Sequence, residues 1–350
     1  MTRSRSAALA VLLPFLGAAI AGAQAIEPPY DAVYTLTDLG AVPGLPTPYG
    51  GLTFLPSNSN VIVIGGAANV VGGALYSIGI VRGAGNHITG FTGTVALHSE
   101  GQFNDGGVVF GPGGVLFYTR YPVNEIGEVK PGSAVNDKIV DLTALGISSS
   151  VGALNFVPGG FPGAGQLKIV SYDTGDWYTA SYTSDGTGTF NITSPVLNTT
   201  IDVGPEGFVY VPPGSPIFPS GTSLLVSEYG NDVVATYQVD AGGNPTPASR
   251  ALFVSGLTGA EGAVIDPVTG DFLFSTFGAT NHVIVVRGFA VPNTPTPTPP
   301  GTAATATPTS TLTPVVSGVP AVVPTLSFPM LVLLGAMLAG GAFWVIARRS

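Results

Sequence analysis

A short phrase recurs five times along the chain and constrains its fold more than any other feature. Each copy opens on a small residue, carries a large apolar residue three positions later and closes on proline after two more. The five copies are residues 51–56, 107–112, 153–158, 207–212 and 262–267. Their prolines stand 46 to 56 residues apart, which is typical of a supersecondary unit that stacks on its neighbours.

Three more apolar segments follow each copy and complete a four-strand unit. The second strands, which end on a small residue, are predicted at 62–65, 117–119, 169–171, 225–227 and 273–275. The third are predicted at 75–80, 126–129, 177–182, 233–239 and 283–286, and the outer ones at 88–97, 139–145, 190–197 and 251–257. We therefore predict an all-β β-propeller with five four-stranded blades. A six-bladed ring with one degenerate copy, a β-sandwich and an open solenoid are the alternatives.

The two ends of the repeated region complement each other. The last copy lacks an outer strand, whereas residues 33–39 form an outer strand that precedes the first copy. Pairing these two segments in one blade would close the ring and remove its open edges. We expect the N-terminal strand to complete the last blade.

The charge distribution excludes one class of partner. The chain has 20 acidic and 11 basic residues, and Arg3, Arg5, Arg348 and Arg349 lie at its two ends, so the body is strongly acidic. Such a surface repels phosphate backbones, which argues against nucleic acid as a partner. The chain contains no cysteine, so disulfides and thiolate metal sites are excluded.

The N-terminus has the pattern of a secretory signal peptide. Two arginines precede an apolar run over 7–21, and small-residue cleavage patterns follow at 21–23 and 23–25. We predict a signal peptide over 1–25 and a β-propeller domain over 26–290. An uncleaved anchor helix is the alternative.

The C-terminal part divides into a linker and a tail. Residues 291–322 are an uncharged Thr/Pro-rich linker, and 328–347 are an apolar run long enough for one transmembrane helix. The tail over 323–350 resembles the IPTL-CTERM sorting signals, relatives of the PEP-CTERM signals, through Pro324, Thr325, Leu326, Ser327, the apolar run and the basic end at Arg348 and Arg349. The resemblance implies processing by an exosortase-type enzyme near Pro324 and Thr325, at the membrane, and a final place in the cell envelope or at the cell surface. A plain membrane anchor is the alternative.

Two local segments resemble known propeller families. Residues 224–231 are similar to the repeat phrase of NHL-type propellers. The pairs Glu206-Gly207 and Glu261-Gly262 are similar to the Glu-Gly that opens blades in regucalcin and gluconolactonase-like propellers, where the glutamate is a metal ligand. The proline and tryptophan expected after that pair are absent, so the resemblance supports the fold more than lactonase activity.

One position of the repeat carries candidate metal ligands. The residue before the opening small residue is glycine in three blades and glutamate, Glu206 and Glu261, in the last two. This position lies at one mouth of the channel, so we expect the two carboxylates to converge, with Asp105 and Asn155 as helpers. Oxygen ligands of this kind suit Ca²⁺ or Mg²⁺. The alternative is that each glutamate accepts hydrogen bonds from loop amides.

The sequence shows no recognisable catalytic set. It contains no nucleophile elbow, no zinc-binding histidine motif and no phosphate-binding glycine loop. Trp177 and Tyr229 lie near turns, where exposed rings would stack on a sugar. The main hypothesis is therefore an exported propeller that acts as a binding platform for a surface protein, glycan or small ligand. A divalent-metal-dependent, lactonase-like hydrolase and a carbohydrate-binding module are the alternatives.

Overall fold

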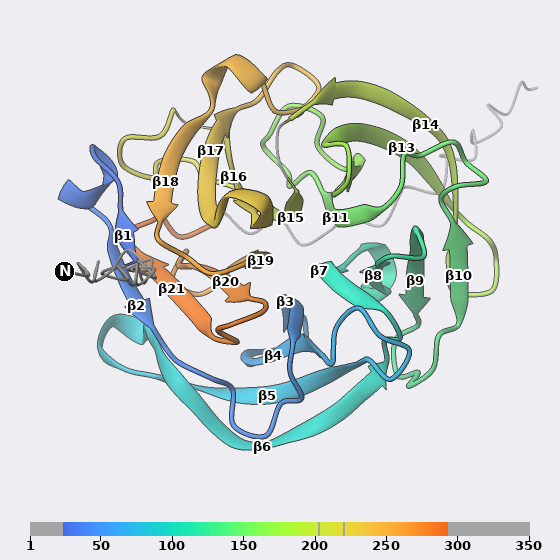
Figure 1. Cartoon of the computed structure of the whole chain (residues 1–350), viewed down its shortest axis with the longest axis horizontal. Coiled ribbons are helices and arrows are strands. Elements are labelled where there is room, and N and C mark those ends of the chain that lie inside the picture. Colours follow the sequence, from blue (N-terminus) through green and yellow to red (C-terminus); the bar gives the residue numbers. More distant parts are fainter. Residues whose placement is uncertain (1–23, 202–203, 220, 293–350) are drawn as a thin grey trace, which may run out of the picture. The chain divides into compact units, whose positions relative to one another are not determined.

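The computed structural model describes residues 24–201, 204–219 and 221–292, and these form five antiparallel sheets around a central axis (Figure 1). The blades contain β3 (Tyr49–Leu55), β4 (Asn58–Gly66), β5 (Ala74–Arg82) and β6 (Ile88–Glu100); β7 (Asn104–Phe110), β8 (Leu116–Arg120), β9 (Glu125–Val129) and β10 (Lys138–Asp141); β11 (Val151–Phe156), β12 (Leu167–Ser171), β13 (Asp176–Ser184) and β14 (Phe190–Thr200); β15 (Pro205–Tyr210), β16 (Ser223–Glu228), β17 (Val233–Gln238) and β18 (Ala251–Ser255); and β19 (Ala260–Ile265), β20 (Phe272–Thr276) and β21 (Val283–Arg287).

The strand prediction from the repeat is confirmed in outline. The five repeated phrases form the inner strands β3, β7, β11, β15 and β19, and consecutive inner strands contact one another around the axis. The ring therefore has five blades rather than six. Many boundaries differ by a few residues; β10, for example, ends at Asp141 although the apolar pattern continues to residue 145.

The N-terminal strand closes the ring as predicted. Strand β2 (Thr35–Asp38) pairs with β21, from Thr35 opposite Arg287 to Asp38 opposite Ile284. A further strand that the sequence pattern did not predict, β1 (Ala25–Ile26), pairs with β18 on the outer edge of blade four. The N-terminal segment is thus attached to both of the last two blades.

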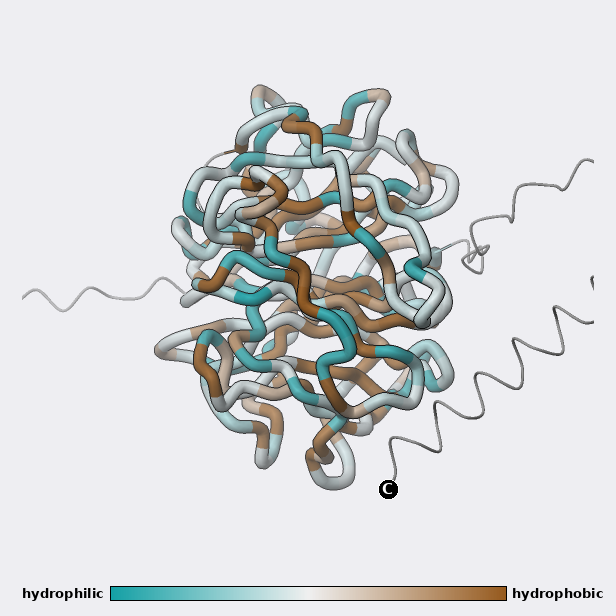
Figure 2. The backbone as a smooth tube through the Cα atoms, turned by 90° about the vertical axis from the view of Figure 1, so that its right-hand side faces the viewer, coloured by the Kyte–Doolittle hydropathy of each residue, from teal (hydrophilic) through white to brown (hydrophobic). Residues whose placement is uncertain are grey.

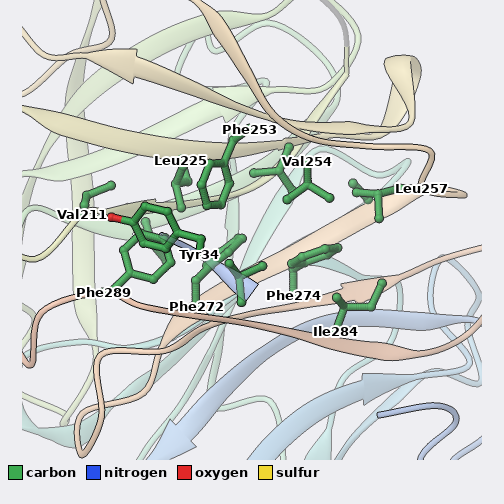
Figure 3. Packing of buried hydrophobic residues seen from close by; sticks show 14 of the residues in the cluster. Tyr34, Val211, Leu225, Phe253, Val254, Leu257, Phe272, Phe274, Ile284 and Phe289 are labelled. Atoms are coloured by element: carbon green, nitrogen blue, oxygen red, sulfur yellow. The ribbon is translucent and has the colours of Figure 1, made fainter. Parts of the chain in front are cut away.

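Apolar side chains fill the seams between blades. Beneath the N-terminal segment, Tyr34, Phe253, Phe272 and Phe289 belong to one buried cluster between blades four and five (Figure 3). Burying a ring of this size stabilises the fold by roughly 2 kcal/mol. In the side view the strands inside the molecule are mainly hydrophobic, whereas hydrophilic stretches lie in loops and along the near side that faces the viewer (Figure 2).

Several expected segments fall outside this description. The signal-peptide core, the transmembrane segment 328–347 and most of the linker lie among residues that are not described. Within the described ranges, no helix has the length and apolar character needed to cross a membrane.

Candidate metal centre

A β-bulge near the start of the inner strand positions each acidic candidate. In blade four the pairing with β16 passes from Pro205 to Gly207 and skips Glu206. Blade five skips Glu261 against β20, and blade two skips Asp105 against β8. A bulge takes its extra residue out of the regular alternation of the strand. The bulges therefore free these three side chains to turn toward the channel.

In blades two and five, the small hydroxyl residue at the end of the second strand stabilises the bulge. The Ser275 hydroxyl accepts a hydrogen bond from the Gly262 N–H at 3.1 Å and donates to the Gly50 carbonyl of blade one at 2.7 Å. The Thr119 hydroxyl of blade two donates in the same way to the Gly152 carbonyl of blade three, at 2.8 Å. In these two blades the hydroxyl thus links its blade to the next one.

The three carboxylates converge at one mouth of the channel. Asp105, Glu206 and Glu261 each offer an oxygen within 4.8 Å of the other two. Glu206 and Glu261 come from neighbouring blades, and Asp105 reaches them from β7, which contacts both β15 and β19. The expectation that the two glutamates share one site with Asp105 agrees with this geometry.

The cluster is buried and lacks partners for its charge. The three residues are 0 to 4% exposed. One oxygen of each, Asp105 Oδ2, Glu206 Oε2 and Glu261 Oε1, has no hydrogen-bond partner. Among the described residues, no lysine or arginine forms an ion pair with any of them. Burial of an unpaired carboxylate is costly unless a cation or a proton compensates it.

Because the carboxylates are buried, their charged forms are disfavoured and their pKa values are raised. Burial raises the pKa of Asp105, Glu206 and Glu261 above the usual range of carboxyl groups. The neighbouring charges of Asp105 and Glu261 raise the pKa of Glu206 further. The Asn69 amide nitrogen, when turned toward the site, donates to Asp105 Oδ1 at 2.9 Å. This hydrogen bond lowers the pKa of Asp105 and so partly offsets the effect of its burial. Such mutual repulsion is what a bound cation would relieve.

An aromatic rim surrounds the cavity above the carboxylates. The cavity has a volume of about 270 Å³ and is lined by Glu206, Glu261, Asn69 and four aromatic residues. The aromatic rim consists of Tyr121, Tyr172, Tyr229 and Phe277, each of which directly follows the second strand of its blade. Successive rings lie edge to face, with centroids 5.4, 6.0 and 5.8 Å apart. Blade one has Ala67 at this point of the repeat, and Asn69 lines the cavity there.

A ring of glycines, which we call the glycine collar, lies just below the carboxylates. It consists of Gly51, Gly106, Gly207 and Gly262. A Cβ atom on Gly106 would lie 1.9 Å from the Glu206 carbonyl oxygen, and one on Gly51 would lie 2.2 Å from the Gly106 carbonyl oxygen. The inner-strand backbones therefore approach so closely that no side chain fits between them. Three of the collar glycines, Gly51, Gly207 and Gly262, open their repeated phrases, so the close approach of the backbones requires glycine at those openings.

Glycine at the carboxylate position of the third blade also has a steric reason. A Cβ atom on Gly152 would lie 2.2 Å from the Pro205 carbonyl oxygen and 3.0 Å from Glu206 Oε2. A side chain there would collide with blade four and crowd the glutamate. The difference between glycine and glutamate at this position of the repeat is thus set by the space at the channel mouth.

The structure does not bring every predicted site residue to this mouth. Asn155 lines a different cavity at the opposite end of the inner strands, and its amide donates to the Phe208 carbonyl at 2.9 Å. It is therefore not a helper ligand. Trp177 is fully buried against Phe208, with ring centroids 4.4 Å apart, so the prediction that it stacks on a ligand is wrong. Tyr229 belongs to the aromatic rim.

Two contributors were missed by the sequence reasoning. Asn69 lies in a loop of blade one with a left-handed backbone, at φ 63°, and carries no motif. Tyr121 directly follows the second strand of blade two, as Tyr229 and Phe277 follow the second strands of their blades. Aligning the residue after each second strand would have revealed the aromatic rim. The predicted processing residues Pro324, Thr325, Leu326, Ser327, Arg348 and Arg349 lie outside the described residues.

Comparison with known proteins adds little to this picture. No family model and no curated protein matches the chain. Among solved structures, an auxiliary nutrient binding protein from Bacteroides ovatus matches with 11% identity and a TM-score of 0.40, over 73% of this chain and 76% of that one. The PQQ domain of a pyranose dehydrogenase from Coprinopsis cinerea matches with 8% identity and a TM-score of 0.42, over 75% and 97%. At these values the likenesses carry no information about ligand or activity.

Proposed function

We propose that this protein is an exported binding propeller that holds a divalent cation on Asp105, Glu206 and Glu261. The observation that carries the proposal is the convergence of three buried carboxylates, one oxygen of each of which has no hydrogen-bond partner. Glu228 of the same blade is equally buried but is compensated, because it accepts hydrogen bonds from Tyr237 and Arg250. A cation is the missing counterpart at the channel mouth.

The donor set favours Ca²⁺ or Mg²⁺. It contains only oxygen atoms, and no histidine or cysteine belongs to the group of candidate ligands. Hard cations prefer such oxygen donors, whereas zinc and copper prefer nitrogen and sulfur. Three protein oxygens leave coordination positions free, and the 270 Å³ cavity gives a ligand access to them. The cation would then help to bind a ligand with oxygen donors beneath the aromatic rim.

Calorimetric titration of the purified protein with Ca²⁺ and with Mg²⁺ tests the proposal. Wild type should bind one ion, and Glu206→Gln should lose about 100-fold in affinity because an anionic ligand is removed. Glu228→Gln is the matched control: it changes a buried glutamate of the same blade that lies outside the cluster, and should leave the affinity unchanged once circular dichroism shows that it is folded. Equal affinities in wild type and Glu206→Gln would refute the proposal.

A metal-dependent hydrolase is the second candidate, because the cluster opens into a cavity large enough for a small substrate. A bound cation would polarise a carbonyl oxygen placed there. The test is turnover of a panel of lactones and glycosides by wild type and by Glu261→Gln, each saturated with Ca²⁺. Turnover that is lost in the variant would establish the hydrolase, whereas no turnover together with tight ion binding leaves a binding protein.

The export and tethering of this propeller rest on the sequence patterns at its ends. The signal-peptide pattern, the Thr/Pro linker and the tail that resembles a sorting signal support secretion followed by processing at the envelope. Intact mass measurement of the protein from a Gram-negative host, with and without an exosortase, tests this. We expect the mass of a chain that ends near Thr325 only when the enzyme is present. A full-length C-terminus in both hosts would favour a plain anchor.

A further inference from the structure

The mouth opposite the carboxylates contains a second and larger cavity. It has a volume of about 570 Å³ and is formed by the far ends of the inner strands β7, β11, β15 and β19. Val109, Leu154, Phe161, Tyr210 and Ile265 are among its lining residues, and no charged residue lines it. The glycine collar lies between this apolar cavity and the carboxylates.

The polar groups of this cavity are already engaged within the protein. The Asn155 side chain donates to the Phe208 carbonyl and accepts from the Phe156 N–H at 2.8 Å. The Tyr210 hydroxyl donates to the Gly243 carbonyl at 2.7 Å. The cavity therefore offers shape and apolar surface rather than charge, and suits an uncharged occupant that needs few hydrogen bonds.

The chain itself leaves the propeller at the rim of this cavity. Phe289 is buried in the cluster beneath the N-terminal segment, and the Ala290 N–H donates to the Ser215 hydroxyl at 3.1 Å. Ser215 is held in turn by the Pro212 carbonyl, at 2.7 Å. Two residues further on, Pro292 lines the apolar cavity. The exit point is thus fixed by packing and hydrogen bonds, at the mouth opposite the carboxylates.

The sequence that follows has the chemistry that the cavity accepts. Residues 293–301 carry no charge and include four prolines. Proline-rich segments have a low entropic cost of ordering and are recognised by grooves lined with aromatic residues. At about 3.1 Å per residue in an extended proline helix, a few residues from Pro292 are enough to enter the cavity. Tethering adds an effective concentration in the millimolar range, so even weak affinity suffices.

We propose that the apolar cavity is an internal docking site for residues 293–301, the first part of the Thr/Pro linker. The docked segment would hold the start of the linker on the propeller instead of leaving it free from Pro292 onward. An external ligand of this mouth, such as an uncharged apolar molecule or a proline-rich peptide, would have to displace it. The proposal does not depend on the cation site.

The absence of cysteine from the chain makes a clean cross-linking test available. In the full-length protein, Thr296→Cys is combined with Val264→Cys, which places a thiol at a half-buried position of the cavity lining. The matched control combines Thr296→Cys with Val268→Cys, an exposed position outside the cavity. It lies two residues from Gly270, which packs on the Ala290 carbonyl near the exit point.

A docked linker and an undocked linker give opposite results. If residues 293–301 occupy the cavity, mild oxidation should form the Val264→Cys disulfide at least about five times faster than the control disulfide. Replacing Pro295, Pro297 and Pro299 by Asp should remove that advantage, because a charged segment is rejected by an uncharged cavity. Faster reaction at the exposed Val268→Cys position, or rates that the three Asp substitutions do not change, would overturn the proposal.

Discussion

Two buried charged sites in this propeller differ in how their charge is compensated. Lys168, on β12, is fully buried, and its ammonium nitrogen lies 2.6 to 2.8 Å from four acceptors: Gln166 Oε1, Thr179 Oγ1, the Gly242 carbonyl and Asn244 Oδ1. The carboxylate cluster is equally buried but leaves three oxygens unpartnered. The same fold therefore gives one buried charged group a full set of hydrogen-bond acceptors and leaves another without a full set of partners.

This difference separates a structural role from a binding role. The acceptors of Lys168 come from blade three and from the turn after β17 in blade four, so the ammonium group links two blades. Every partner is a neutral oxygen fixed in the fold, and nothing remains for a ligand to supply. Glu206 and Glu261 line a cavity, and one oxygen of each of the three carboxylates has no hydrogen-bond partner. A ligand is expected only where compensation is missing.

The largest effect is expected from Lys168→Ala. This change leaves buried acceptors in two blades without a donor, so the free energy of unfolding should fall by roughly 3 to 5 kcal/mol. Urea denaturation followed by circular dichroism measures it. The Ca²⁺ affinity of the folded variant should equal that of wild type. A loss below about 1 kcal/mol would show that the link between the blades contributes little.

The buried Lys168 should also make the stability of the protein depend on pH. Burial lowers the pKa of Lys168 to about 8, below its unfolded value of 10.5, and the charge of Asp240 opposes this shift. The unfolded chain thus binds more protons between these values, so stability should rise with pH, by on the order of 2 kcal/mol from pH 8 to pH 10.

The measurement is urea denaturation at saturating Ca²⁺, which keeps the carboxylates ionised. Lys168→Met should abolish the rise. The series should stop near pH 10, because burial raises the pKa of Tyr210 and Tyr237, and such tyrosines make stability fall at higher pH. A rise of the same size in Lys168→Met would assign it to other groups.

The repeat could be predicted from the sequence, whereas contacts between different blades could be predicted only in part. The proline phrases predicted all five inner strands, and the register of the phrase placed Glu206 and Glu261 at one mouth, because both properties follow from the repeat itself. Lys168 could not be recognised, since its acceptors come from another blade and depend on packing. The exposure of Trp177 was predicted wrongly for the same reason. Its position near a turn does not determine whether Phe208 of blade four covers its ring.

Mutation of the carboxylate cluster should stabilise the metal-free protein, whereas Lys168→Ala should destabilise it. When a chelator keeps the protein free of metal, Glu206→Gln removes a charge that is disfavoured by burial and by the neighbouring carboxylates. The free energy of unfolding should therefore increase by about 1 kcal/mol. The same variant loses Ca²⁺ affinity, which means that saturating Ca²⁺ should stabilise wild type and leave the variant nearly unchanged. Thermal unfolding with and without Ca²⁺ checks both statements. A destabilised variant in the chelator would show that Glu206 has a structural partner after all.

The smallest expected effect is the coupling between the two sites. Lys168 and the carboxylate cluster share no hydrogen-bond partner, and the acceptors of Lys168 lie in side chains and a turn that do not line the carboxylate cavity. In a double-mutant cycle of Lys168→Met and Glu206→Gln in chelator, the effects on the free energy of unfolding should add to within about 0.5 kcal/mol. Coupling above 1 kcal/mol would mean that blade four transmits changes from its outer turn to the channel, and the two sites would then have to be treated as one.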